Sequence, residues 1–260
     1  MLQQIPSDYY TSSAVAWFFT AWAGALAVLI FPWTIYRLVK KKDSVPILVW
    51  FGGIICSLIE PMLDELGHVW WALNLPVHVF RGFDMTIPIL VVLAYIFFVA
   101  FSGYWAYCKI RKGLTVKGVF YVWLALIATD VVLEYPGLIL GAYTYYGDQP
   151  FRLFNFPLWW TWVNATGWLL IGLLLWLVVP HLRGWANLII LLVPVTGFGT
   201  GYGVVAWPNF MALNWEMPVI VAWMLSTFSL GIALLVVRGI AAMVATDSPL
   251  RLKDWSAVTF

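Results

Sequence analysis

Two pairs of acidic residues lie four apart in otherwise apolar stretches of the sequence. Glu60 and Asp64 form one pair, and Asp130 and Glu134 form the other. On a helix this spacing places both side chains of a pair on one face, about a turn apart. Burial in an apolar pocket disfavours the charged form of a carboxyl group, and a second acid nearby adds to that effect. The pairs therefore predict a site that keeps a protonated acid at neutral pH, as general acid catalysis requires.

Other polar residues lie close to the same predicted site. Glu216 stands just before Pro218, where it could close a ring with the two acid pairs. Asn164 lies inside the next apolar run after Glu134 and is expected to hydrogen-bond an acid or a substrate oxygen. The candidate catalytic residues are Glu60, Asp130, Glu134 and Glu216.

A simpler interpretation is that the acids only mark the membrane boundary, solvated or paired with Arg81 and Arg152. This interpretation is favoured for the acids near the ends of their runs, namely Asp64, Glu65, Asp84 and Asp148. A functional role is favoured for Glu60, Asp130 and Glu134, which lie deeper in their runs, and Glu216 fits both interpretations equally.

Tryptophan is unusually frequent, with 18 residues in 260. Interfacial belts of Trp and Tyr at the two membrane edges explain part of this number. Aromatic faces also stabilise cations. The residues expected to shape and bind a substrate are Asp64, Trp70, Trp71, Tyr135, Tyr143, Tyr145, Trp159, Trp160, Asn164 and Trp215.

The composition is that of an integral membrane protein. Hydrophobic residues make up 63% of the chain and charged residues only 10%, whereas soluble domains carry about 25% charged residues. A membrane-spanning helix needs roughly 20 mostly apolar residues. The sequence predicts one all-α domain over residues 1–260, a bundle of seven transmembrane helices at 14–38, 46–66, 86–108, 118–140, 157–179, 185–206 and 218–244.

The basic residues predict the orientation of this bundle. Twelve of the 14 Lys and Arg residues fall in loops or helix ends on one side, and Arg81 and Arg152 fall on the other. The positive-inside rule then places the N-terminus outside and the C-terminus inside. Nine of the 12 acids, including both pairs, fall towards the outer side. The loop at 67–85 on that side could form a re-entrant or interfacial lid.

Several other classes of function are disfavoured. The segment Gly197–Gly203, GFGTGYG, lacks the strand and the acid that a dinucleotide-binding motif requires, so close helix packing is the favoured interpretation. Basic residues spread over membrane edges do not form a nucleic-acid-binding face. With no aspartate-rich metal motif and two basic residues on the acidic side, we expect neither a metal site nor a diphosphate substrate.

Two families are similar to parts of this pattern. Seven helices with a Glu late in the second and an acid near the last resemble the integral-membrane terpene cyclases of meroterpenoid pathways, found in fungi with bacterial counterparts. In that family two acids are implicated in protonating an epoxide or alkene, and by position they map to Glu60 and Glu216. Glu216 departs from the family because it precedes its helix and replaces an aspartate.

The second resemblance covers about thirty residues. Glu134 with Gly137, then Gly141, Tyr143 and Tyr145, then Pro157-Leu158 is similar to the membrane carotenoid hydratases of bacterial C50 and acyclic carotenoid pathways. Both families imply acid-initiated protonation of an isoprenoid double bond or epoxide, ending in ring closure in one and in addition of water in the other.

The sequence and these resemblances together predict a terpene cyclase of the isomerase or lyase type. It would act without cofactor, metal or redox chemistry on a lipid-soluble isoprenoid or prenylated substrate. We expect it in the bacterial inner (plasma) membrane, in contact with membrane lipid, with no nucleic-acid partner, and downstream of a prenyltransferase. The alternatives are a hydratase using the same protonation chemistry, or a non-enzyme: a small-molecule or proton-coupled transporter or a membrane receptor.

Overall fold

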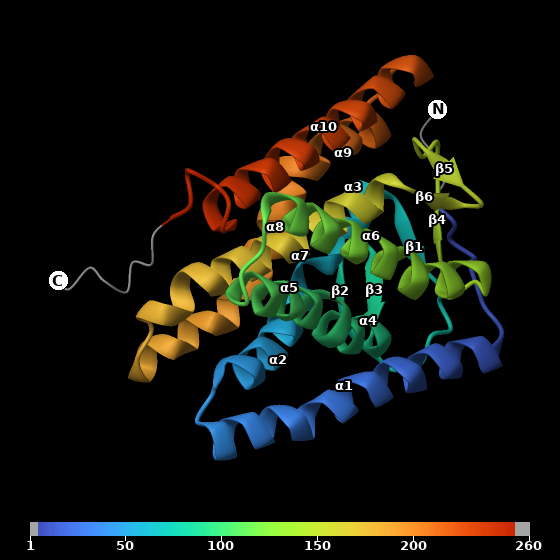
Figure 1. The fold of residues 1–260 in the computed structure, drawn as a ribbon. Coiled ribbons are helices and arrows are strands. Elements are labelled where there is room, and N and C mark those ends of the chain that lie inside the picture. Colours follow the sequence, from blue (N-terminus) through green and yellow to red (C-terminus); the bar gives the residue numbers. More distant parts are fainter. Residues whose placement is uncertain (1–4, 253–260) are drawn as a thin grey trace.

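The computed structural model describes residues 5–252 and is mostly helical (Figure 1). Lys253, one of the twelve basic residues counted on the inner side, and Asp254, one of the acids on that side, lie outside the described residues. Within residues 5–252, seven helical spans are long and apolar enough to cross a membrane, which confirms the predicted all-α, seven-helix fold class. They cover Ser13–Lys41, Val45–Gly67, Ile89–Arg111, Val116–Ile139, Trp159–His181, Gly184–Asn214 and Val219–Val244.

The first, fourth, fifth and seventh spans each consist of one long α-helix, and in the fifth span a short 3₁₀ turn (Val179–His181) follows it. These helices are α1 (Ser13–Lys41), α6 (Val116–Ile139), α7 (Trp159–Val178) and α10 (Val219–Val244). α7 packs against α5, α6, α8 and α10, and most of its side chains are buried. It is therefore the central helix of the bundle, while α1 and α10 expose most of their apolar surface.

The other three spans are interrupted. The second contains α2 (Val45–Cys56), a 3₁₀ turn at Ser57–Ile59, and α3 (Glu60–Gly67). The third contains α4 (Ile89–Ala94), a π-helical segment (Tyr95–Phe101) and α5 (Ser102–Arg111). The sixth contains a 3₁₀ segment (Gly184–Leu192), α8 (Val193–Gly201), a π-helical segment (Tyr202–Ala206) and α9 (Trp207–Asn214).

Proline explains two of these interruptions. Pro61 and Pro208 each stand in the first turn of a new helix, where a missing backbone N–H is tolerated. Because the chain resumes a helix at Trp207, the sixth span runs to Asn214, eight residues beyond the end predicted at residue 206. Hydropathy alone could not show this continuation, since Asn209 and Asn214 lower it.

Glycines allow the central helices to approach closely. A Cβ on Gly201 would lie 2.6 Å from the Cα of Gly167, and one on Gly197 would lie 2.7 Å from the backbone nitrogen of Ile171. The small residues four apart in GFGTGYG thus let α8 pack directly on α7, as the sequence predicted. Gly203 has no neighbour within 4 Å at this position, so it takes no part in that contact.

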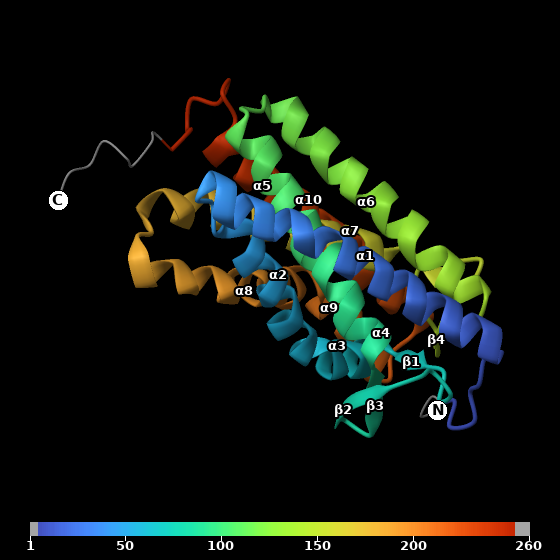
Figure 2. The same ribbon diagram turned by 90° about the horizontal axis from the view of Figure 1, so that it is seen from below.

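Short strands cover one end of the bundle (Figure 2). β1 (Val69–Trp71) pairs antiparallel with β4 (Tyr143–Tyr145). This pairing joins the loop that follows the second span to the loop that follows the fourth. β2 (His78–Gly82) pairs with β3 (Met85–Pro88), and β5 (Arg152–Leu153) pairs with β6 (Phe156–Pro157). The loop at 67–85 is thus built of strands over the bundle end, with no helical re-entry between His68 and Asp84.

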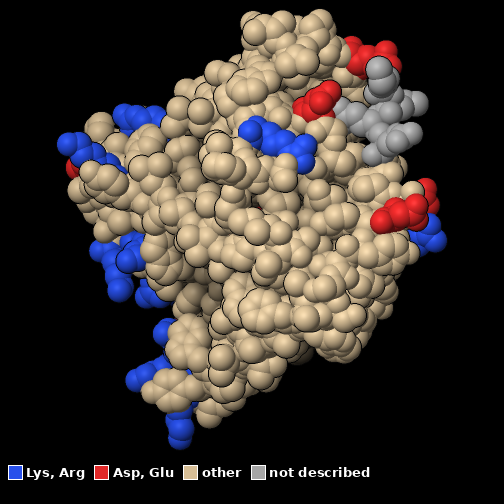
Figure 3. All heavy atoms as spheres, turned by 90° about the vertical axis from the view of Figure 1, so that its right-hand side faces the viewer, with Lys and Arg blue, Asp and Glu red and all other residues tan. Residues whose placement is uncertain are grey.

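The charged side chains follow the asymmetry seen in the sequence. On the face shown in Figure 3, most Lys and Arg side chains lie along one side, and most Asp and Glu side chains lie towards the opposite edge. Arg81 and Asp84 form an exposed ion pair at 3.3 Å, and Arg37 pairs with Asp43 at 2.5 Å. The direction in which the bundle sits in a membrane remains a prediction.

Candidate active site

A cavity of about 120 Å³ lies inside the bundle beneath the β1–β4 pair. Since a buried water needs roughly 10–15 Å³ of such space, the cavity has room for several waters or part of a slender apolar chain. Its walls come from α1, α3, α4, α6, α7 and α8, the two π-helical segments, and β1 and β4. Eight predicted site residues line it: Glu60, Asp64, Trp71, Glu134, Tyr143, Tyr145, Trp160 and Asn164.

The first acid pair reaches the cavity from α3. Glu60 is the first residue of this helix, immediately after the 3₁₀ turn, and Asp64 follows one turn later on the same face. The hydroxyl of Tyr95 donates to Oε2 of Glu60. The indole Nε1 of Trp71 donates to Oδ2 of Asp64 at 2.8 Å, and Asp64 is only 2% exposed. Neither acid is paired with Arg81, so the boundary interpretation favoured for Asp64 is not what the structure shows.

The second acid pair reaches the cavity from α6 through Glu134. Tyr145 donates to its Oε2 at 2.7 Å, and Asn164 donates to its Oε1 at 3.0 Å. The Tyr143 hydroxyl lies 3.1 Å from the same Oε2 and 3.0 Å from the backbone oxygen of Glu134, so its one hydrogen is shared between these two acceptors. Tyr143 and Tyr145 stand two apart on β4, so their side chains point to the same face of the strand. Three donors around one carboxyl group suit its acceptor-only, ionised form.

The two tyrosines remain donors over the whole physiological range. Burial raises the pKa of the Tyr143 hydroxyl well above its ordinary value, and the neighbouring Glu134 raises it further. The same two causes, in the same order, raise the pKa of Tyr145. Both hydroxyls are therefore protonated and directed at Glu134.

Asn164 links the two acids of α6. Its Nδ2 donates to Oδ1 of Asp130 at 2.8 Å as well as to Glu134, and its Oδ1 accepts from the Tyr202 hydroxyl at 2.5 Å. The predicted hydrogen bond between Asn164 and an acid is therefore confirmed. Asp130 itself is fully buried behind Asn164 and does not line the cavity.

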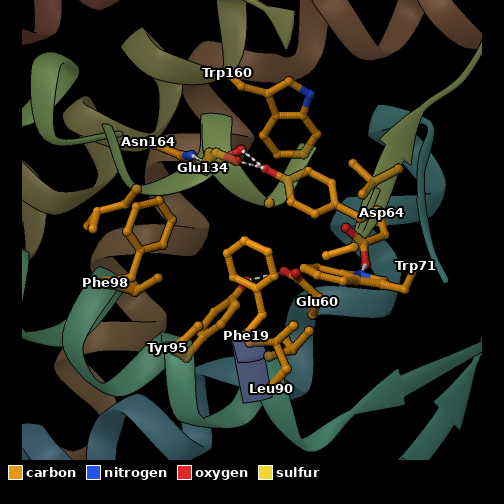
Figure 4. A pocket seen from close by; sticks show the side chains of 18 of the residues that line it. Phe19, Glu60, Asp64, Trp71, Leu90, Tyr95, Phe98, Glu134, Trp160 and Asn164 are labelled. Carbon is orange, nitrogen blue, oxygen red and sulfur yellow. Dashed lines mark hydrogen bonds between the residues drawn. The ribbon is translucent and has the colours of Figure 1, made fainter. Parts of the chain in front are cut away.

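The carboxyl groups approach the cavity from opposite walls. Figure 4 shows Glu60 and Asp64 on one side and Glu134 with Asn164 on the other, with Phe19 between them. Aromatic rings fill much of the remaining wall: Phe19, Trp22, Trp71, Tyr95, Phe97, Phe98, Tyr143, Tyr145, Trp160, Phe198 and Tyr202. None of the described lining residues is Lys, Arg or His, so the charged groups at the cavity are all acids.

The structure places five other predicted residues away from the cavity. Trp215 is 61% exposed and Glu216 is also exposed, because α9 continues to Asn214 and carries both past the bundle end. Trp70 alternates with Trp71 on β1 and therefore points to the opposite face of the strand. Trp159 donates to Oε1 of Gln149 at 2.9 Å, and Tyr135 packs against Phe156.

Two hydroxyl donors at the site, Tyr95 and Tyr202, were not predicted. Tyr95 is the single polar residue in the apolar run from Ile87 to Phe101, and Tyr202 follows the glycine-rich segment. An isolated hydroxyl in an apolar run is a signal that could have identified Tyr95. Tyr202 carries no comparable signal, because its position depends on a π-helical segment that the sequence does not mark.

Within residues 5–252, no group of three or more His, Cys, Asp or Glu side chains is arranged to hold a metal ion.

No family model, curated protein or solved structure matches this chain. The seven long apolar spans within residues 5–252 and the composition are those of an integral membrane protein.

Proposed function

We propose that this protein is a membrane enzyme that protonates a double bond or epoxide of a lipid-soluble isoprenoid and so starts its cyclisation. The observation that carries the proposal is the meeting of three carboxyl groups from two spans, Glu60, Asp64 and Glu134, in one aromatic-lined cavity. Ionisable side chains within spans are expensive to keep and usually mark function. The resemblance to meroterpenoid cyclases supports the same chemistry through Glu60.

Glu60 is the proposed proton donor. Its Oε2 accepts a hydrogen bond from the Tyr95 hydroxyl. Within residues 5–252, no other side chain donates to the Glu60 carboxyl group. The other oxygen, Oε1, can then carry a proton that faces the cavity. Protonation of an alkene uses its π electrons to form a C–H bond and leaves a cation on the neighbouring carbon; protonation of an epoxide breaks a C–O bond with the same result.

The cation is then consumed within the cavity. A second double bond of the chain attacks it, forming a C–C bond and moving the positive charge to another carbon. Aromatic faces such as those of Phe19, Trp71 and Trp160 stabilise this charge, each by about 0.5–2 kcal/mol. Loss of a proton to Glu134, which is held by three donors as an acceptor, restores a double bond. The product is an isomer of the substrate.

Hydration is the second candidate, because the cavity has room for water beside Glu134. The first step is the same protonation by Glu60. Water then adds to the cation and gives its extra proton to Glu134, so the product carries one more molecule of water than the substrate.

The test is expression in a host that makes farnesylated or carotenoid precursors, followed by mass spectrometry of the extracted lipids. We expect a new product with unchanged mass for cyclisation, or with the mass of one added water for hydration. Purified protein should not turn over farnesyl diphosphate, because the cavity is lined by acids and would repel the head group. Absence of any new product, or activity that a Mg²⁺ chelator abolishes, contradicts the proposal.

A further inference from the structure

Asp130 is the one predicted acid that is buried without reaching the cavity. Its side chain is 0% exposed. Oδ1 accepts from Asn164 at 2.8 Å, but Oδ2 has no hydrogen-bond donor among the described residues. An ionised carboxylate with an unpaired oxygen in a membrane-spanning bundle would be costly, because a buried charge requires hydrogen-bonding partners.

Glu134 lies one helical turn from Asp130, and both carboxyl groups share one amide group: Nδ2 of Asn164 lies 2.8 Å from Oδ1 of Asp130 and 3.0 Å from Oε1 of Glu134. Two ionised carboxylates held this close inside the bundle disfavour each other's charge, and neither has a hydrogen to donate to the other. One of the pair must therefore carry a proton. Glu134 already accepts from Tyr143, Tyr145 and Asn164, whereas nothing donates to Oδ2 of Asp130. The proton belongs on Asp130.

The neighbouring amide fits this assignment. Asn164 uses its Nδ2 for both acids, and its Oδ1 accepts from Tyr202. The amide therefore cannot turn to offer an oxygen to Asp130 without losing the Tyr202 contact. With a neutral Asp130, every hydrogen bond of this chain points towards Glu134. Tyr202 donates to Asn164, and Asn164 and Asp130 both donate to Glu134.

We propose that Asp130 is a permanently protonated positioning residue that donates a hydrogen bond to Glu134 and holds it as the acceptor of the cavity. Its effect on turnover rests on the function proposed above, whereas its protonation does not. Asp130 touches no substrate in this scheme, since it lies behind Asn164 and outside the cavity wall.

Infrared spectroscopy tests the protonation without any substrate. In membranes or detergent at neutral pH, the carbonyl band of protonated carboxylic acids should be weaker in Asp130→Asn than in the wild type, while the contribution of protonated Glu60 remains in both. Asp84→Asn is the matched control, because Asp84 is exposed and paired with Arg81; it should leave the band unchanged. An Asp130→Asn spectrum with the full acid band, or a loss of carboxylate absorption instead, overturns the proposal.

Rescue by the amide tests the positioning role. Asparagine has the shape of a neutral aspartic acid and can donate to Glu134, so Asp130→Asn should fold and keep turnover within about threefold of wild type. Asp130→Ala removes the donor and should lower kcat by about tenfold with KM little changed. If Asp130→Asn does not fold, or loses as much activity as Glu134→Gln, the assignment of the proton is wrong. If the wild type makes no product, the proposed function fails while the infrared result still decides this inference.

Discussion

Tyr95 and Tyr202 occupy equivalent positions in two different spans: each is the first residue of a π-helical segment. Each also donates its hydroxyl hydrogen to a polar group of the same cavity, Tyr95 to Glu60 and Tyr202 to Asn164. π-Helical turns are rare and are frequent at functional sites. Since an extra residue in the turn alters which face a side chain occupies, these segments help aim both hydroxyls inward.

Tyr202→Phe should destabilise the fold and lower activity. The change removes the donor to Oδ1 of Asn164, a residue that is 2% exposed. An unsatisfied buried acceptor costs about 1–3 kcal/mol, so the melting temperature in detergent should fall. Tyr121→Phe is the control, because Tyr121 is 68% exposed, and this variant should melt at the same temperature as the wild type. Equal melting of both variants would show that this hydrogen bond contributes nothing to stability.

The contact between α7 and α8 can be tested with two glycines of the same segment. Gly201→Ala places a methyl group 2.6 Å from the Cα of Gly167, so the helices must separate. Overpacking of this kind costs typically about 1–3 kcal/mol. Gly203→Ala meets no atom within 4 Å and should be neutral or slightly stabilising. Thermal melting of the two variants measures the difference, and a Gly201→Ala protein as stable as Gly203→Ala would refute the close approach.

His68 should make stability depend on pH. Burial lowers the pKa of His68, against an opposing effect of its contact with Asn214, and its ring stacks on Tyr146 at 4.6 Å. When pH falls through the ordinary histidine pKa of about 6.5, the unfolded chain gains a proton that the folded chain resists. Stability should therefore be complete above that pH and decrease below it.

The measurement for His68 is the melting temperature on both sides of this range. His68→Asn should flatten the decrease, and asparagine tolerates the positive φ of 58° at this position. His181→Gln, at an exposed position near the opposite end of the bundle, is the control and should leave the decrease as it is. An unchanged pH profile in His68→Asn would remove His68 from the explanation.

The orientation of the bundle is testable with a reporter fused after Phe260. Twelve basic residues on one side against two on the other predict that the C-terminus lies in the cytoplasm. A reporter active only in the cytoplasm should therefore work, and one active only outside should not. The opposite result would reverse the membrane sides assigned to the cavity.

The sequence was sufficient to predict the seven helical spans and to single out two of the acids that line the cavity, Glu60 and Glu134. Spacing of four residues placed Glu60 with Asp64 and Asp130 with Glu134 on common faces, and the structure keeps both pairs. Spacing could not show that Asp130 lies behind Asn164, because the rotation of a helix within a bundle depends on its neighbours.

Long-range geometry also decided which residues reached the cavity. Glu216 and Trp215 lie away from it because α9 extends the sixth span to Asn214, and hydropathy does not reveal that extension. Tyr143 and Tyr145 reach Glu134 because β4 pairs with β1, a contact between loops more than seventy positions apart in the chain. Such pairings follow from the tertiary fold and have no local signal.

The activity of Glu60→Gln tests the central claim most directly. The amide keeps the shape of the side chain and can still accept from Tyr95, but it has no proton to donate. General acids typically contribute about 10²–10⁴-fold in rate, so product formation should fall on that scale while the protein folds and inserts normally. Glu65→Gln, the same change on the same helix at a residue that does not line the cavity, should keep wild-type turnover. Full product formation by Glu60→Gln would contradict the account.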